Sequence, residues 1–234
     1  MIDGVIFDKD GTLFDFRRTW GEWSVRLVTE LAGGDAGRAA DLGRCIGFDL
    51  ATRDFHPDSP VIGGTPPEIA AILLPHLPGV QAGALVARMN TLAASVALAE
   101  VLPLRPYLES LRARGLRIGL VTNDAEAPAR SHLGAVAVTD LFDFIAGCDS
   151  GHGAKPGPGQ LLAFARATGL DPARVVMVGD SLHDLHAGHA AGMRTVAVLT
   201  GIAKAPALAP HAEAVLPDIG HLGGWIDHAN AAVA

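Results

Sequence analysis

Cysteine is scarce in this chain, with only Cys45 and Cys148 among 234 residues. Two isolated thiols exclude a disulfide-stapled scaffold and are typical of a reducing compartment, so we expect a cytoplasmic protein. Charged residues are also few, at 18%, and acidic residues outnumber basic ones, which gives a formal net charge of −7. That balance argues against a general partner of nucleic acids or of anionic membranes.

Long apolar runs are missing as well. Residues 81–99 come closest to a membrane span, but Arg88, Asn90 and many small side chains favour a packed helix. The first residues lead directly into an apolar stretch, without the basic start and cleavage site of a secretory signal, so none is expected. Hydrophobic residues make up 49% of the chain, enough for the core of one large domain or of a domain with a sizeable insert.

The most informative pattern present is the run Phe-Asp-Lys-Asp-Gly-Thr-Leu at residues 7–13. It follows residues 2–7, whose apolar, β-branched character predicts a short buried strand. Side chains two residues apart on an extended segment point the same way, so Asp8 and Asp10 should project from the strand end into one small space. Two such carboxylates are unfavourable unless they share a cation or a proton. The pair therefore suggests catalysis, in which one carboxylate attacks while its neighbour transfers protons.

Three further short patterns lie downstream. They are Leu-Val-Thr-Asn-Asp at 120–124, Lys-Pro at 155–156, and Val-Gly-Asp-Ser-Leu-His-Asp at 178–184. Together with residues 7–13, they resemble the four motifs of the haloacid dehalogenase-like hydrolase superfamily, in the family's order. Each pattern alone is common, but four in order, three of them at the ends of predicted strands, make a specific signal.

The second half of the chain alternates between predicted strands and helices. Strands are expected at 116–121, 144–146, 175–178 and 195–198, and helices at 125–133, 158–168 and 182–191. This alternation predicts an α/β fold with a Rossmann-like parallel sheet and helices on both faces. Ligands of such sheets bind beyond the carboxyl ends of the strands, where Asp8, Thr122 and Asp180 are all expected.

The middle segment has a different pattern. Helices are expected at 19–31, 35–46, 66–74 and 81–100, with Gly- and Pro-containing turns between them and no strand. We therefore predict an inserted all-helical cap of residues 15–100 on a core made of residues 1–14 and 101–234. A helical cap at this point in the chain is what the family resemblance implies.

The resemblance also implies roles for the motif residues. Asp8 matches the nucleophile that attacks phosphorus and forms an aspartyl-phosphate, and Asp10 matches the general acid and base. Thr122, through its hydroxyl, and Asn123, through its backbone N–H, are expected to bind the phosphoryl oxygens. Lys155 is expected to neutralise part of their charge.

A divalent cation is implied as well. Asp180 is expected to bind Mg²⁺ together with Asp8 and the backbone carbonyl of Asp10, because hard oxygen ligands suit this ion. Asp184 either contacts the metal or one of its waters, or instead stabilises the start of a helix. The charge balance also calls for a cation, because four aspartates and a phosphate dianion cannot converge without positive charge.

Three arginines complete the set of candidate site residues. Arg17 and Arg18 follow the first motif at the expected hinge, and Arg53 lies in a polar turn of the cap. Each is either a contact for the distal part of an anionic substrate or an ordinary solvated surface charge. Lys9, between the two aspartates, departs from the apolar residue that is commoner in the family, and the sequence assigns it no role.

The function implied is that of a Mg²⁺-dependent phosphatase acting on a small phosphorylated metabolite. Asp10 favours phosphate-ester chemistry over dehalogenation, because a departing halide needs no proton. Asp184 departs from the usual fourth motif of β-phosphoglucomutases and favours the phosphoglycolate phosphatase-like branch. A β-phosphoglucomutase-like phosphoryl transferase and a non-catalytic binding module on the same fold are the alternatives.

Overall fold

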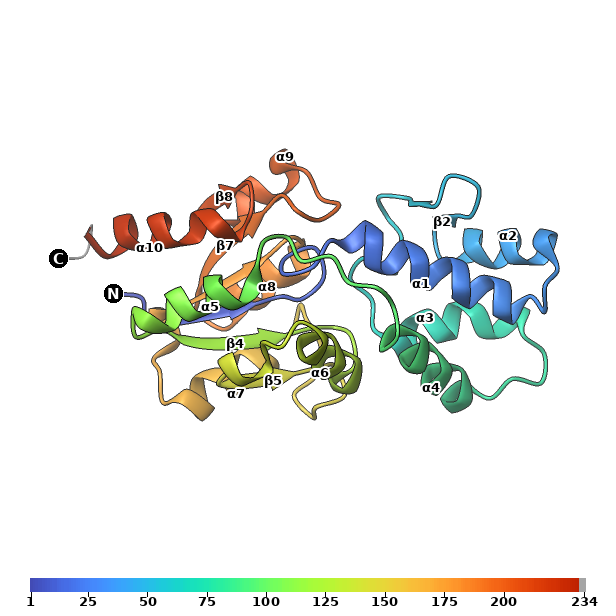
Figure 1. The fold of residues 1–234 in the computed structure, drawn as a ribbon, viewed down its shortest axis with the longest axis horizontal. Helices are drawn as coiled ribbons and strands as arrows, with labels where there is room; N and C mark the ends of the chain where they lie inside the picture. The colour runs from blue at the N-terminus through green and yellow to red at the C-terminus, as the bar shows by residue number, and fades with distance from the viewer. Residues whose placement is uncertain (232–234) are drawn as a thin grey trace.

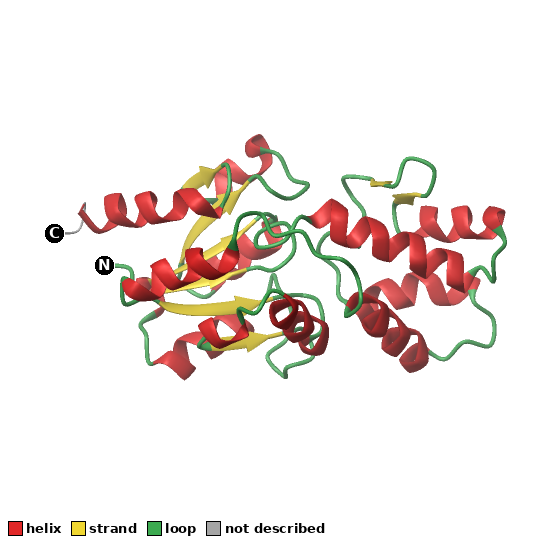
Figure 2. Ribbon diagram, viewed as in Figure 1, coloured by secondary structure: helices red, strands yellow, loops and turns green. Residues whose placement is uncertain are grey.

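The computed structural model describes residues 1–231, and its central layer is a six-stranded sheet in which all neighbouring strands are parallel (Figure 2). In sheet order the strands are β5 (Phe144–Ala146), β4 (Arg117–Val121), β1 (Gly4–Phe7), β6 (Val175–Gly179), β7 (Arg194–Val198) and β8 (Ala214–Leu216). β1 lies inside the sheet, and all of its residues are buried. The α/β class predicted from the sequence is confirmed.

Helices cover both faces of this sheet. One face carries α5 (Leu104–Ala113), α6 (Glu126–Ala135) and α10 (Leu222–Ala231), the other carries α7 (Gly159–Thr168) and α8 (Leu182–Ala190), and a short helix α9 (Ala205–Leu208) follows β7. Alternation along β1 divides the core accordingly, since Val5 and Phe7 pack with the first group and Ile6 with the second. Among residues 1–231, no helix has both the length and the apolar character that crossing a bilayer requires.

The segment between β1 and α5, which we call the cap, forms a separate group of helices beside the sheet (Figure 1). Its helices are α1 (Phe16–Leu31), α2 (Ala36–Cys45), α3 (Pro66–Leu73) and α4 (Ala82–Ala93). Asp15, Asp35 and Thr65 cap the first three by accepting hydrogen bonds from backbone N–H groups of the first turn. The cap encloses its own hydrophobic cluster around Trp23 and Leu27. The boundaries at residues 15 and 100 stay a prediction, which this separate cluster supports.

The helix expected over residues 81–100 ends early, at Ala93. The following residues instead bond to the chain that enters the cap. Asp15 donates its backbone N–H to Ala99 O at 2.8 Å, and Val101 donates to Leu13 O at 3.0 Å. These long-range hydrogen bonds override the helix propensity of an alanine-rich stretch.

The cap also contains a two-stranded antiparallel hairpin that the sequence did not predict. Its strands are β2 (Phe48–Asp49) and β3 (Asp54–Phe55). Strands of two residues are too short to leave a readable alternation of polar and apolar side chains.

Candidate active site

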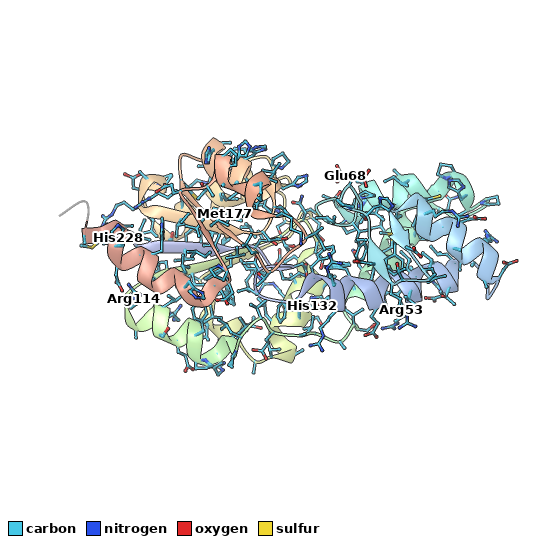
Figure 3. All side chains as sticks on the ribbon, turned by 90° about the horizontal axis from the view of Figure 1, so that it is seen from above. Arg53, Glu68, Arg114, His132, Met177 and His228 are labelled. Atoms are coloured by element: carbon cyan, nitrogen blue, oxygen red, sulfur yellow. The ribbon has the colours of Figure 1, made fainter. Side chains whose placement is uncertain are left out.

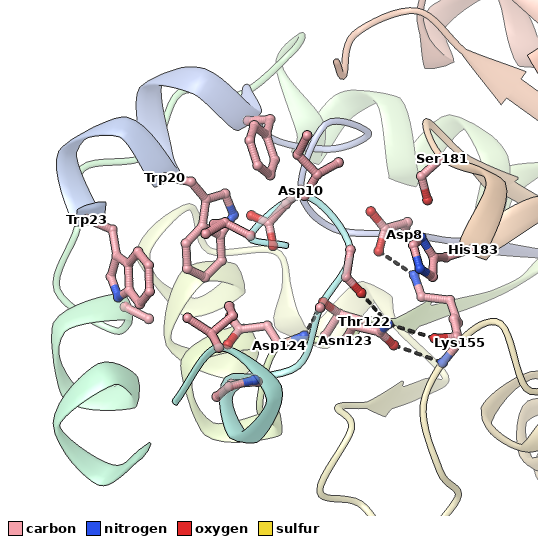
Figure 4. Close-up of a pocket in the computed structure, with 18 of the residues that line it drawn as sticks. Asp8, Asp10, Trp20, Trp23, Thr122, Asn123, Asp124, Lys155, Ser181 and His183 are labelled. Carbon is pink, nitrogen blue, oxygen red and sulfur yellow. Dashed lines mark hydrogen bonds and ion pairs between the residues drawn. The ribbon is translucent and has the colours of Figure 1, made fainter. Parts of the chain in front are cut away.

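Three strands bring the residues that follow them to one edge of the sheet. β1 lies between β4 and β6 in parallel register, so Asp8, Thr122 and Asp180 meet there, and all three are buried. The backbone N–H of Asp8 donates to Val178 O at 2.9 Å, which extends the ladder to the site itself. Figure 4 shows the pocket at this edge, the position at which α/β sheets bind ligands.

Three buried carboxylates converge at this edge of the sheet. Asp8, Asp180 and Asp184 each offer an oxygen, and these oxygens lie within 4.8 Å of one another. Burial raises the pKa of Asp8 to about 7, with a further contribution from Asp184 and opposition from Lys155. Burial also raises the pKa of Asp180 well above its usual range. This concentration of negative charge among hard oxygen atoms fits a divalent cation such as Mg²⁺.

Two glycines let Asp180 approach the first motif closely. A Cβ at Gly11 would lie 2.5 Å from Asp180 Oδ2, and a Cβ at Gly201 would lie 1.7 Å from the same atom. Gly11 also has a φ of +82°, which residues with a Cβ rarely adopt. A larger residue at either position would displace the carboxylate from the cluster.

Lys155 places a positive charge among these carboxylates. Its Nζ lies 2.5 Å from Asp8 Oδ1 and 2.6 Å from Asp184 Oδ1, and it donates to Val121 O at 3.1 Å. Burial disfavours the charged form of Lys155, but the attraction of the Asp184 and Asp8 carboxylates outweighs this effect. The pKa of Lys155 is therefore above its usual value. Asp184 also forms a capping box with Ser181 at the start of α8. Asp184 thus both stabilises the helix start and faces the cluster.

Asn123 connects three parts of the site. Its side chain accepts from Lys155 N–H at 2.8 Å, and it donates to Lys155 O at 2.8 Å and to Gly63 O of the cap at 2.7 Å. The Thr122 hydroxyl beside it accepts from Asp124 N–H at 3.1 Å. The sequence suggested only the backbone N–H of Asn123, because its side-chain partners lie 32 and 60 residues away. Phosphate binding by Thr122, Asn123 and Lys155 stays a prediction.

Lys9 is fully buried among three acceptors. Its Nζ lies 3.2 Å from Asp10 Oδ2, 2.6 Å from Asp124 Oδ2 and 3.0 Å from His132 Nδ1. An ammonium has three N–H donors, so each has a partner. His132 Nε2 lies 2.7 Å from the carbonyl of Ala93, where cap and core meet (Figure 3). A carbonyl only accepts, so Nε2 carries the proton and Nδ1 accepts from Lys9.

Burial and neighbouring charge have opposite effects on the pKa of Lys9, whereas burial and the charge of Lys9 both lower the pKa of His132. Burial disfavours the charged form of Lys9, but Asp10 and Asp124 outweigh it and raise the pKa of Lys9 above its usual value. The pKa of His132 is lowered, mainly by burial and then by the charge of Lys9. A charged lysine beside a neutral histidine is therefore the consistent state.

Asp10 lines the pocket, and its two carboxylate oxygens differ in their surroundings. Its Oδ2 faces Lys9, while Oδ1 is buried without a hydrogen-bond partner among residues 1–231. The Asp10 carboxylate lies outside the cluster of three metal-binding candidates. Metal binding through its backbone carbonyl stays a prediction.

The pocket encloses about 590 Å³, part of it open to solvent, and its two walls differ. The core supplies the carboxylates, Lys155 and Thr122, whereas the cap supplies mainly apolar side chains such as Trp20 and Ile62. His183 of α8 also lines the pocket, and a Cβ at Gly63 would lie 2.5 Å from its Nδ1. The cap loop thus lies directly against α8.

Comparison with known proteins agrees with this geometry. Residues 2–192 match the family model of the haloacid dehalogenase-like hydrolases. The chain belongs to this family. The resemblance inferred from the four motifs is therefore confirmed.

Curated relatives of this haloacid dehalogenase-like hydrolase include phosphoglycolate phosphatases. It is 35% identical over 119 residues to that of Rhodospirillum rubrum, across 51% of the chain and 49% of the relative. It is 27% identical over 205 residues to that of Aquifex aeolicus, across 86% of each. The chain thus spans about half the length of the Rhodospirillum relative, and less than half of several others. The solved β-phosphoglucomutase of Clostridium difficile shares the fold, with a TM-score of 0.70 at 18% identity over 97% of the chain and 96% of that structure.

The three candidate arginines of this hydrolase lie outside the pocket among the described residues. Arg17 forms an ion pair with a surface aspartate, Arg18 and Arg53 are exposed, and Figure 3 shows Arg53 at the edge of the cap. α1 begins at Phe16, and Phe16 and Trp20, four residues apart on one face, turn towards the pocket while the two arginines after Phe16 turn away. Substrate recognition by these arginines stays a prediction that this arrangement does not favour.

Proposed function

We propose that this hydrolase is a Mg²⁺-dependent phosphoric monoester hydrolase that acts on a small phosphorylated metabolite through an aspartyl-phosphate on Asp8. The observation that carries the proposal is the meeting of Asp8, Asp10, Asp180 and Lys155, from three distant segments, at one buried edge of the sheet. A non-catalytic binding module would have no use for a buried nucleophile beside a second carboxylate with a free oxygen.

The reaction follows from the positions of these groups. An Asp8 oxygen forms a bond to phosphorus as the bond to the alcohol oxygen breaks, and Asp10 gives that oxygen a proton. A water molecule then attacks the aspartyl-phosphate and gives its proton to Asp10, which releases phosphate and restores Asp8. Lys155 keeps its positive charge beside Asp8 throughout. Bound Mg²⁺, held by Asp8 and Asp180 with Asp184 beside them, would neutralise charge on the phosphoryl oxygens.

The relatives' names suggest phosphoglycolate as the first substrate to test, and the two free thiols support a cytoplasmic location. A β-phosphoglucomutase-like transferase is less well supported. A mutase must hold a sugar phosphate at a second point, and the cap wall offers no charged side chain for it among the described residues.

Release of inorganic phosphate tests this proposal. The purified protein should hydrolyse p-nitrophenyl phosphate and at least one metabolite in a panel of small phosphate esters when Mg²⁺ is present. Beryllium fluoride, which mimics a phosphoryl group, should bind to the Asp8 carboxylate in a crystal of the treated protein. Absence of phosphate release from every ester in the presence of Mg²⁺ would contradict the proposal.

Replacing Asp10 by asparagine should lower kcat by about 10²–10⁴-fold for alkyl phosphates, the usual contribution of a general acid and base. The loss should be smaller for p-nitrophenyl phosphate, because a nitrophenolate departs without a proton. Steady-state kinetics on both esters measure the difference. An equal loss for the two esters would show that Asp10 does not protonate the leaving group.

A further inference from the structure

We infer that the alcohol part of the natural ester is uncharged and largely apolar, unlike the carboxylate-bearing alcohol of phosphoglycolate. This inference rests on the proposed phosphatase function and concerns which ester fits the pocket. The observation is the cap wall, where every lining side chain is uncharged. Large apolar side chains of that wall, opposite the carboxylates of the core, include Phe16, Trp20, Val61, Ile62 and Met89.

A carboxylate on the substrate would need a cation, but the described cap wall has no charged side chain and the lysine of the core wall is already paired. Lys155 donates to Asp8, Asp184 and a backbone carbonyl, and Lys9 is fully surrounded by its three acceptors. Within residues 1–231, no arginine and no lysine other than Lys155 lines the pocket, and His183 of the core is the one further basic side chain there. Asp10 and Asp124 line it too and would repel a second anion. An unpaired carboxylate held in such surroundings is strongly unfavourable.

Asn90 further restricts which alcohol group of the ester fits the pocket. It is the one amide side chain that the cap contributes to the described pocket, and its Oδ1 is buried without a partner among residues 1–231. Buried polar atoms are nearly always hydrogen-bonded, so a ligand is expected to satisfy this one. The fitting alcohol is therefore neutral, mostly apolar, and carries one hydroxyl or amide donor.

Three benzyl phosphates of nearly equal leaving-group ability separate charge from size. Benzyl, 4-carbamoylbenzyl and 4-carboxybenzyl phosphate differ only at a position far from the reacting oxygen. We expect kcat/KM for 4-carboxybenzyl phosphate and for phosphoglycolate to fall at least about 100-fold below that for 4-carbamoylbenzyl phosphate, the size of effect usual for an uncompensated buried charge. Equal or better turnover of the carboxylates would overturn the inference and leave the phosphatase function standing. Inactivity on every ester would overturn both.

A charge introduced into the cap wall gives a second measurement. Ile62 is half-buried on the cap loop, so Ile62→Arg should fold. It should raise kcat/KM for 4-carboxybenzyl phosphate and lower it for the benzyl ester, whereas Ile62→Gln, a polar control without charge, should lower both. An unchanged ratio of the two esters in Ile62→Arg would show that this wall does not contact the alcohol.

We propose separately that Lys9 is a positioning residue for Asp10. The observation here is the saturated set of acceptors around Lys9, which holds Asp10 Oδ2, while Asp10 Oδ1 has no hydrogen-bond partner among residues 1–231. His132 extends this network to the carbonyl of Ala93, the last residue of α4. The carboxylate that is to transfer protons is thus tied through buried hydrogen bonds to the place where the cap joins the core.

The double variant Lys9→Met/Asp124→Asn tests this role without leaving a buried charge unpaired, since it removes one positive and one negative charge together. Loss of Asp10 positioning should lower kcat for alkyl phosphates at least about 10-fold while p-nitrophenyl phosphate is hydrolysed almost normally. A merely structural role would lower the active fraction, and hence both rates, by the same factor. That equal loss would overturn the proposal, as would wild-type rates on both esters.

Discussion

Replacing Asp8 by asparagine is expected to abolish phosphate release, by at least about 10⁴-fold in kcat, while the protein stays folded. The amide has almost the same shape but cannot attack phosphorus. The ionised Asp8 carboxylate is itself costly in the metal-free protein, because burial raises its pKa to about 7. A neutral side chain removes that cost, so the Tm of the metal-free variant should stay within about 4 °C of the wild type.

A matched control is available for this substitution. Asp3 lies at the start of β1 and forms its ion pair with Arg174, away from the pocket. Asp3→Asn should leave kcat unchanged, whereas Asp8→Asn should show neither turnover nor a beryllium fluoride adduct. Turnover by Asp8→Asn at the wild-type rate would rule out the aspartyl-phosphate route.

Removal of divalent cations is expected to abolish activity to a similar degree. Asp8, Asp180 and Asp184 converge with only Lys155 between them, so a phosphate dianion would meet uncompensated negative charge. EDTA should stop phosphate release, excess Mg²⁺ should restore it, and Ca²⁺ should restore it poorly, because its longer bonds and higher ligand number suit this cluster less well. Activity that persists in chelator would show that the charge balance is wrong.

The pH dependence of metal binding offers a readout that does not depend on turnover. The pKa of Asp8 is raised above 3.8 to about 7, so the metal-free protein loses stability as the pH rises through that interval. Mg²⁺ competes with the proton, and its stabilising effect should therefore be larger at pH 8 than at pH 5. Thermal unfolding with and without Mg²⁺ measures this difference. Asp180→Ala should reduce the Mg²⁺-dependent rise in Tm more than Asp184→Ala does, and an equal rise at both pH values would contradict the assignment.

Much of the core and of its site can be predicted from local sequence patterns. Apolar runs at residues 2–7, 116–121 and 175–178 predict strands, and parallel strands end at the same edge of a sheet. The polar residues that follow them, Asp8, Thr122 and Asp180, must therefore meet, and the structure brings them together. The order of the four motifs identifies the family for the same reason, because each motif is a short stretch with a fixed place at a strand or loop end.

Contacts between distant segments depend instead on tertiary structure. The sequence left Lys9 without a role, because its partners Asp124 and His132 lie 115 and 123 residues away. It likewise named Arg17 and Arg18 as candidate substrate contacts because they follow the first motif, with a solvated surface charge as the alternative. The start of α1 at Phe16 decides which side chains face inward, and that start depends on a cap fixed at both ends by long-range hydrogen bonds.

Composition and periodicity by themselves indicated the α/β class and the helical insert, because these follow from repeats of two and about 3.6 residues along the chain. The resemblance of four short motifs to a known family implied the carboxylates of the site. Only the folded chain decided that the cap wall is apolar, that Asn123 bridges to Gly63 and that Lys9 holds Asp10. These features arise where side chains from separate elements meet in a buried space, and their choice of partner depends on packing and charge compensation in three dimensions rather than on spacing in the sequence.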